Sequence, residues 1–204
     1  MARSAEADAT RGHRKKARTR SQLLAAGWRA LESKGDALTA RDVTDAADMS
    51  TGTFYNYFVD TDDLVDEITR QQLLDIAAED TLGSMEDPAL RIAVTATQIL
   101  RRALVDPVWG TLVLRLVYRA HQPNRMNGHL RDDIVEGYES GRFARDADDA
   151  TLDQAMGLLV MTIRRFVAGD DRPGLVPAMV ARLLETLGIS SDEAERLAAD
   201  AAAH

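Results

Sequence analysis

A run of small and hydroxyl-bearing residues between positions 50 and 57 carries the most distinctive chemistry in the sequence. Phe54 aside, its members are Ser50, Thr51, Gly52, Thr53, Tyr55, Asn56 and Tyr57. No carboxylate occurs between Asp48 and Asp60. Hydroxyl and amide groups donate hydrogen bonds to phosphate oxygens and base edges, and threonine methyl groups can meet the methyl of thymine. The run therefore suits contact with a nucleic acid.

Three predicted helices position this run. The spacing of apolar residues predicts helices from about Lys15 to Lys34, from about Thr39 to Ala46 and from Thr51 to about Tyr57. Gly35 is placed to end the first helix, and Ser50 to cap the third. Two short helices joined by a tight turn cannot bury a core alone, so the first helix must complete a helix-turn-helix unit. Its expected core is Leu23, Leu31, Val43, Phe54 and Phe58.

Charge is unevenly distributed along the chain. The net charge is −8, which by itself argues against binding a polyanion. Residues 1–59 nevertheless hold 10 basic and 7 acidic residues, a balance of +3, which leaves −11 for residues 60–204. A basic amino-terminal module on an acidic body fits a protein that presents one end to a nucleic acid. A basic tail without a partner is the alternative.

The rest of the chain also predicts helices and no convincing strand. Asp60, Asp87 and Asp106 are placed as amino-terminal caps, the last two directly before prolines. The predicted segments are Asp60 to Thr81 or Leu82, one each from Pro88 and Pro107, about Gly128–Ser140, about Asp149–Ala168, Pro173–Gly188, and a final helix after Ser190 or Ser191, with a loop at His121–Asn124. The fold class is therefore all-α, with nine or ten helices.

Length and composition limit the class of protein. A chain of 204 residues with 45% hydrophobic residues and no cysteine can bury a core without metals or disulfides. No signal peptide or membrane span is expected, so we expect a soluble cytoplasmic protein. Three regions are predicted: a basic flexible arm over 1–14, a helix-turn-helix domain over 15–60 and a larger helical domain over 61–204.

The segment from Leu23 to Leu64 resembles the DNA-binding domain of the TetR (tetracycline repressor) family of one-component regulators. The most specific match is Ser50–Phe58, STGTFYNYF, followed by Asp62-Asp63-Leu64 and preceded by Thr39, Val43 and Ala46. The resemblance implies a three-helix DNA-binding domain followed by a helical ligand-binding and dimerisation domain. It also implies a regulator, most often a repressor, that binds a palindromic operator in double-stranded DNA as a homodimer and is released by a small-molecule effector. No catalytic residue, metal or cofactor is implied.

Several residues match family positions that contact DNA. Thr39 and Arg41 match positions that reach phosphates or bases, Tyr55 matches the commonest phosphate donor, and Gly52 permits close approach to the duplex. The full expected set is Lys15, Lys16, Arg18, Thr39, Arg41, Ser50, Thr51, Gly52, Thr53, Tyr55, Asn56, Tyr57 and Thr61.

Two positions depart from the family pattern. Thr61 stands where the family usually has a phosphate-binding lysine, so less salt-dependent affinity is expected there. Asp48 stands where glycine is usual, and aspartate tolerates a left-handed turn. Lys15, Lys16 and Arg18 are expected to compensate by meeting phosphates or the minor groove.

Apolar stripes near the carboxyl end predict a dimer contact. Helix-turn-helix proteins present two copies about 34–36 Å apart to a palindrome, so the copies must be held together. The helices at 149–168 and 173–188 suit a four-helix bundle across a two-fold axis. Use of both stripes within one subunit is the alternative. The expected interface residues are Leu152, Met156, Leu159, Ile163, Val176, Met179, Val180, Leu183 and Leu187.

A ligand cavity is expected between residues 102 and 166, where aromatic and methionine side chains gather. Such side chains usually form core, but they also line adaptable cavities between helices. The expected lining is Arg102, Trp109, Arg115, Tyr118, Met126, Tyr138, Met156 and Phe166, and the expected effector is largely apolar. An effector would favour a conformation in which the helix after Asp60 swings, so that the two recognition helices no longer match the operator.

An enzyme is the competing class. His121 and His129, with Asp132 and Asp133 nearby, could bind a metal, but their spacing matches no common zinc pattern. No phosphate-binding glycine motif or activated serine is evident in the sequence. A third class, a helical scaffold, would show no preference for any DNA sequence.

Overall fold

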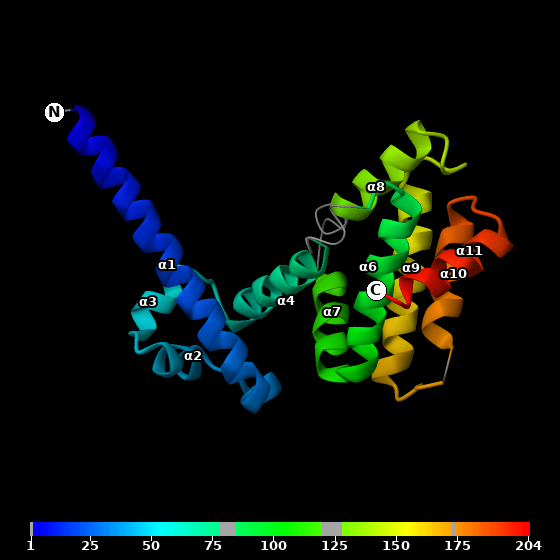
Figure 1. The fold of residues 1–204 in the computed structure, drawn as a ribbon. Coiled ribbons are helices and arrows are strands. Elements are labelled where there is room, and N and C mark those ends of the chain that lie inside the picture. The colour runs from blue at the N-terminus through cyan, green and yellow to red at the C-terminus, as the bar shows by residue number, and fades with distance from the viewer. Residues whose placement is uncertain (1, 78–84, 120–127, 173) are drawn as a thin grey trace. The chain divides into compact units, whose positions relative to one another are not determined.

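The computed structural model describes residues 2–77, 85–119, 128–172 and 174–204. Within these ranges the chain forms ten α-helices and no strand, which confirms the all-α prediction (Figure 1). The chain divides into two compact units, the first ending at Ile68 and the second beginning at Thr69. No helix in these ranges has the length and apolar character needed to cross a lipid bilayer.

The first unit contains α1 (Ala2–Lys34), α2 (Ala40–Ala47), α3 (Thr51–Tyr55) and the start of α4 (Thr61–Ala77). Helix α1 begins at Ala2 rather than at Lys15, so residues 2–14, predicted as an arm, lie within it. Four of these thirteen residues are alanine, the strongest helix former, and none is proline, so Gly12 alone does not end the helix.

The core of the first unit contains all five residues predicted from the sequence. These are Leu23, Leu31, Val43, Phe54 and Phe58, and each is buried. A Cβ atom at Gly27 of α1 would lie 2.6 Å from Leu64 Cδ2 of α4. The absence of a side chain at Gly27 therefore allows the first turns of α4 to pack closely on α1.

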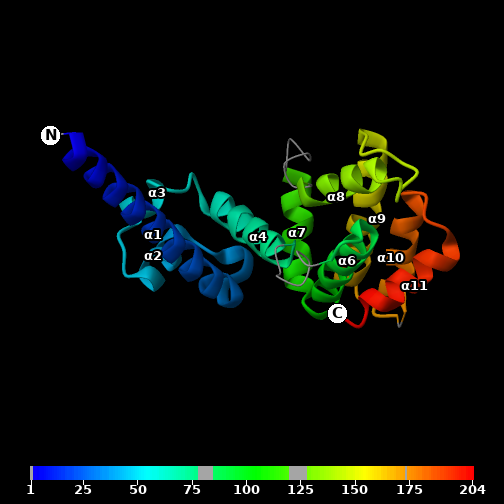
Figure 2. The same ribbon diagram turned by 45° about the horizontal axis from the view of Figure 1, so that its top comes forward.

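The second unit is built around α6 (Pro88–Val105). Its other helices are the end of α4, α7 (Pro107–Arg119), α8 (Gly128–Glu139), α9 (Asp149–Val167), α10 (Leu175–Thr186) and α11 (Ser191–Ala201). Helix α6 contacts α7, α8, α9, α10 and α11. In Figure 2, α6 and α9 lie between α7 on one side and α10 and α11 on the other.

The predicted caps of the second unit are present. The Asp87 carboxylate accepts a hydrogen bond from the Ala89 N–H at 2.9 Å, and the Asp106 carboxylate accepts one from the Trp109 N–H at 2.9 Å. Gly188, with φ of +93°, lies directly after the last turn of α10, as predicted. Three predicted features fall outside the described residues: the helix end at Thr81 or Leu82, the loop His121–Asn124 and the helix start at Pro173.

Arg142 joins three parts of the second unit. Its Nε and Nη2 atoms each donate to Asp87 at 2.9 Å, and its Nη1 atom lies 2.9 Å from Glu193 Oε1 of α11. The hydrogen bonds from Arg142 hold the pKa of Asp87 below its usual value, although partial burial acts to raise it. Arg142 thus links the start of α6 to the start of α11.

Replacing Arg142 by methionine is expected to lower the free energy of unfolding at pH 7 by about 1–2 kcal/mol, because two partly solvated carboxylates lose their partner. A carboxyl group whose folded pKa is lowered stabilises the protein above its unfolded pKa of about 3.9 and loses that effect as pH falls through the lower folded value. The difference between wild type and Arg142→Met should therefore shrink below about pH 4. Denaturant unfolding at pH 7 and pH 3 measures this.

The exposed neighbour Arg145 provides the matched control. Arg145→Met should change the free energy of unfolding much less at either pH value, because its interaction with Asp148 is exposed to solvent. An equal loss in the two variants, or a difference that persists at pH 3, would contradict the role of Arg142.

Candidate DNA-binding surface and ligand cavity

Helix α3 is fixed by its cap and by two buried aromatic rings. The Ser50 hydroxyl accepts a hydrogen bond from the Thr53 N–H at 3.2 Å and lies 2.9 Å from Thr53 Oγ1. Phe54 and Phe58 are buried, with ring centroids 5.6 Å apart. Ser50, expected at the DNA surface, thus serves as the helix cap that the sequence also predicts.

The opposite side of α3 faces solvent. Thr51, Gly52, Tyr55 and Asn56 are exposed, and Thr53 and Tyr57 are half-buried. The Tyr55 ring packs edge-on against Phe54 at 5.3 Å while 60% of the residue stays exposed. We call the exposed set Thr51, Gly52, Tyr55 and Asn56 the α3 surface. It offers hydroxyl and amide groups on a helix that the Ser50 cap and the buried Phe54 and Phe58 rings hold in place.

Helix α2 supports this surface through its own cap and a left-handed turn. The Thr39 hydroxyl accepts from the Asp42 N–H at 3.2 Å, and the Asp42 carboxylate accepts from the Thr39 N–H at 3.0 Å. The Thr39 hydroxyl also donates to Asp42 Oδ2 at 2.5 Å, and this bond and the one from the Thr39 N–H hold the pKa of Asp42 below its usual value. Asp48 adopts φ of 53° and ψ of 49°, so aspartate takes the left-handed position as predicted.

The four basic residues expected to contact DNA are all exposed. Arg41 is exposed, and its Nε atom lies 3.7 Å from Asp45 Oδ2 in a solvated pair of the kind that contributes little stability. Lys15, Lys16 and Arg18 on α1 are exposed. Each of these side chains can therefore turn toward a phosphate at small cost.

Arg20 has a structural role that the sequence did not reveal. Its Nη1 atom donates to Glu67 Oε1 of α4 at 3.1 Å, and its guanidinium lies 5.3 Å from the centre of the Phe58 ring. It links α1, the end of the α3 segment and α4. The sequence could not distinguish this structural role of Arg20 from the exposed positions of the neighbouring basic residues, because it does not show which residues of α4 face α1.

Thr61 is half-buried at the first position of α4. Asp60 caps this helix by accepting from the Asp63 N–H at 2.8 Å, and Asp63 in turn accepts from the Val59 N–H at 3.0 Å. The Thr61 hydroxyl is therefore at a well-ordered helix start.

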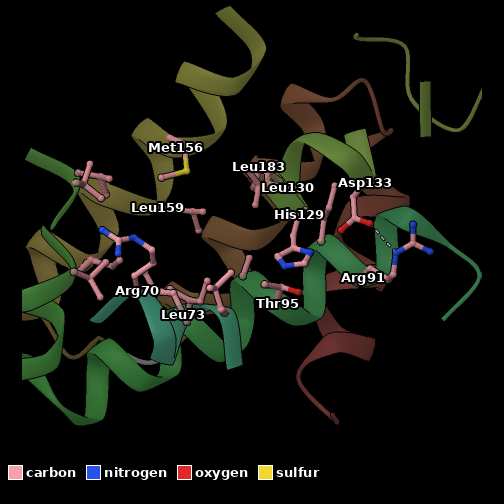
Figure 3. Close-up of a pocket in the computed structure, with 18 of the residues that line it drawn as sticks. Arg70, Leu73, Arg91, Thr95, His129, Leu130, Asp133, Met156, Leu159 and Leu183 are labelled. Carbon is pink, nitrogen blue, oxygen red and sulfur yellow. Dashed lines mark hydrogen bonds and ion pairs between the residues drawn. The ribbon is translucent and has the colours of Figure 1, made fainter. Parts of the chain in front are cut away.

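A cavity of about 460 Å³ lies within the second unit (Figure 3). Its walls come from α4, α6, α7, α8, α9 and α10. Most of its lining is aliphatic: Leu73, Leu74, Ile92, Ala96, Ile99, Val113, Val117, Leu130, Met156, Leu159, Val160, Ile163 and Leu183. The polar lining residues are Arg70, Arg91, Thr95, His129, Asp133 and Glu136. A mainly apolar hollow with a few polar groups is typical of a small-molecule site.

The polar lining is organised by Arg91. Its Nε atom donates to Asp133 Oδ1 at 2.8 Å, its Nη1 atom donates to the Met85 carbonyl at 2.7 Å, and its Nη2 atom donates to Glu136 Oε2. Burial raises the pKa of Asp133 above its usual value, although Arg91 acts to lower it. Only 21% of the Asp133 side chain is exposed, so its carboxylate is poorly solvated.

The cavity differs from the lining expected from the sequence. Of that set Met156 alone lines it, and Met126 lies outside the described residues. Arg102 is exposed and its guanidinium lies over the buried Trp109 ring at 5.3 Å, while Phe166 is buried in the core. Tyr118 and Tyr138 are 69% and 46% exposed, and Arg115 is half-buried outside the cavity lining. The aromatic residues of this region thus lie in the core or on the surface, and the side chains that line the cavity are mainly aliphatic.

The stripes expected at a dimer contact pack within the unit itself. Leu152, Ile163, Val176, Val180, Leu183 and Leu187 are buried, and Met179 is half-buried. Met156 and Leu159, also half-buried, line the cavity together with Ile163 and Leu183. The small and apolar residues that α9 and α10 expose are different ones: Ala150, Gly157, Met161, Pro177 and Ala178.

The histidine and aspartate residues considered for a metal do not form a cluster in the described part of the chain. No group of three or more His, Asp or Glu side chains with metal-binding geometry occurs there. His129 and Asp133 line the cavity, Asp132 is exposed, and His121 lies outside the described residues.

Two family models match the chain. The model of the bacterial regulatory proteins of the tetR family matches residues 23–68, which include α2 and α3. The model of the tetracyclin repressor-like C-terminal domain matches residues 87–200, which include α6 to α10 and most of α11. No curated protein matches the chain significantly.

Solved structures share the fold. RolR in complex with resorcinol is 26% identical, with a TM-score of 0.71 over 91% of this chain and 95% of its own. RolR without ligand is 24% identical, with a TM-score of 0.74 over 88% and 95% of the two chains. FadR from Bacillus subtilis in complex with stearoyl-CoA is 15% identical, with a TM-score of 0.60 over 83% and 99%.

The second family model alone spans more than half of the chain, and the first covers the helix-turn-helix. Proteins of this family are DNA-binding transcriptional regulators and not enzymes. The chain therefore belongs to the TetR family of bacterial transcriptional regulators.

Proposed function

We propose that the protein is a repressor that binds a palindromic operator as a homodimer and releases it when a small molecule occupies the cavity of the second unit. The observation that carries the proposal is the α3 surface, an exposed set of donors without a carboxylate. A protein with this function works in the cytoplasm, where operator DNA lies.

The DNA contact is proposed to centre on Thr51, Gly52 and Tyr55. A Cβ atom at Gly52 would meet only Ser50 Oγ, at 3.8 Å, so packing within the subunit does not require glycine there. Close approach of a DNA duplex would explain why position 52 is a glycine. The remaining proposed contacts are Thr53, Asn56, Tyr57 and Thr61 beside α3, Thr39 and Arg41 on α2, and Lys15, Lys16 and Arg18 on α1.

The homodimer is proposed to use the outward faces of α9 and α10. Both helices expose apolar groups, including Met161 at 48% exposure, although their main stripes are buried in the subunit. A two-fold contact through these faces would hold two copies of α3 in one molecule, as recognition of a palindrome requires.

Helix α4 is proposed to transmit the effect of the ligand. Its first turns pack in the DNA-binding unit through Leu64 and Glu67. Its later turns supply Arg70, Leu73 and Leu74 to the cavity. A ligand that favours one position of the later turns therefore biases the first turns too, which is differential binding to two states. The ligand complexes of RolR and FadR support a ligand in this fold.

Selection of binding sites from random duplexes tests the proposal. Purified full-length protein should enrich a palindrome whose half-sites lie about one helical turn apart, or a multiple of that distance. Light scattering of the protein with the selected duplex should give at least two subunits per site. Recovery of no preferred sequence at low salt would contradict the proposal.

Removing the hydroxyl of Tyr55 is expected to weaken operator binding without loss of stability. Tyr55→Phe keeps the ring contact with Phe54 and deletes a donor to a charged phosphate, so affinity should fall by about tenfold. Fluorescence anisotropy with the selected duplex measures the affinity, and thermal unfolding measures the stability. Tyr118→Phe, which changes a tyrosine of similar exposure in the second unit, should leave operator affinity unchanged.

A further inference from the structure

The polar groups of the cavity occupy one corner between α6 and α8. Arg91 and Thr95 are four residues apart on α6, and His129 and Asp133 are four residues apart on α8, so each pair shares one face of its helix. The Arg91–Asp133 hydrogen bond joins the two faces. Figure 3 shows Thr95 and His129 at the same end of the cavity as Arg91 and Asp133, and Arg70 at the other end. Any ligand that fills the apolar part must face this corner.

The charge of the guanidinium in this corner is already balanced by two carboxylates. All three nitrogens of Arg91 already donate, to Asp133, Glu136 and the Met85 carbonyl, and the side chain is 14% exposed. Arg70 at the other end is itself engaged in a polar interaction. A ligand carboxylate would therefore meet two carboxylates and one arginine in the corner, and like charges repel more strongly in a partly buried site than in water.

The corner does offer acceptors. Asp133 uses Oδ1 for Arg91, and its second carboxylate oxygen, Oδ2, is a further acceptor. Glu136 likewise uses Oε2 for Arg91. A poorly solvated carboxylate oxygen gains most from a ligand group that donates a hydrogen bond. Thr95 and His129, one helical turn along, can donate to the same group. A hydroxyl satisfies both demands because it donates and accepts.

We propose that the ligand of this cavity is an uncharged, mainly apolar molecule whose hydroxyl group donates to Asp133, with Thr95 and His129 as neighbouring donors, and that carboxylate ligands are rejected. The inference rests on the proposed function, in which this cavity is the effector site. The aliphatic walls take the body of the ligand, and the corner between α6 and α8 selects its head group.

Three probes with the same butylphenyl body test the head group. They are 4-butylphenol, 4-butylbenzoate and butylbenzene, and their binding to the full-length protein at pH 7 is measured by isothermal titration calorimetry. The phenol should bind about tenfold more tightly than each of the others, because the benzoate is repelled and butylbenzene leaves Asp133 unpaired. Equal or tighter binding of the benzoate, or no binding of the phenol, would overturn the inference.

Charge-removing variants assign the preference to the corner. Asp133→Asn should weaken phenol binding by about tenfold and strengthen benzoate binding, because the amide can donate to a carboxylate. Asp132→Asn, which changes an exposed neighbour that does not line the cavity, should keep both affinities within about twofold of wild type.

Where loss of the Arg91 bond prevents Asp133→Asn from folding, Glu136→Gln provides the second variant, since the Glu136 side chain is more than half exposed. Glu136→Gln should lower the ratio of 4-butylphenol affinity to 4-butylbenzoate affinity about threefold. An unchanged preference in the folded variant would overturn the inference.

The two levels of the proposal fail differently. Tighter binding of the benzoate in the wild type, abolished by the cavity-filling substitution Ala96→Phe, would overturn the hydroxyl head group and leave the cavity as the effector site. Binding of 4-butylphenol that survives filling of the cavity would overturn both, because the ligand would then lie elsewhere.

Discussion

The substitution Thr51→Glu is expected to lower operator affinity by at least about 100-fold, because the carboxylate would face DNA phosphates in both subunits of a dimer. Thr51 is exposed at the first position of α3. A negative charge in the first turn of a helix is favourable or neutral for folding. The variant should therefore unfold at the wild-type temperature, and the whole effect should appear in binding. Fluorescence anisotropy with the selected duplex measures it.

Thr51→Gln is the control for this prediction. It has the length of glutamate without the charge, so its loss of affinity should be about tenfold or less. Equal losses in the two variants would assign the effect to size rather than charge. Wild-type affinity in Thr51→Glu would show that α3 does not face the duplex.

Filling the cavity is expected to uncouple the ligand from the DNA. Ala96 of α6 is buried and lines the cavity, and the volume of about 460 Å³ can accept a larger side chain. Ala96→Phe should lower the affinity for 4-butylphenol by at least about tenfold, because the ring takes space that the ligand needs. Operator affinity without ligand should stay near the wild-type value, because the added ring is carried by α6 and not by α4, the helix through which the ligand is proposed to act. Calorimetry and anisotropy measure the two affinities.

Val105→Phe is the control, because it places the same ring on the same helix at an exposed position that does not line the cavity. It should retain ligand binding. A parallel loss of ligand and operator binding in Ala96→Phe, with a lower unfolding temperature, would point to general damage and contradict the prediction.

The helix-turn-helix unit could be predicted almost completely from the sequence, because its determinants are local. Ser50 caps the helix that follows it, Asp48 takes the left-handed turn, and Phe54 and Phe58 point inward at four-residue spacing. The exposed side of α3 followed directly from these positions. The caps Asp87 and Asp106 were predictable for the same reason.

The cavity and the use of the carboxyl-terminal stripes depended on the tertiary structure. The apolar period of α9 and α10 shows that one face is buried, but not whether the subunit's own helices or a partner bury it. Leu183 and Val180 pack within the subunit, which no property of their own helix reveals. Arg91 and Asp133 meet across 42 residues of sequence. The chain by itself determined which residues cap, turn and point inward, because those depend on neighbours within a few residues. Only folding decided which distant side chains share a cavity, because that depends on how whole helices pack.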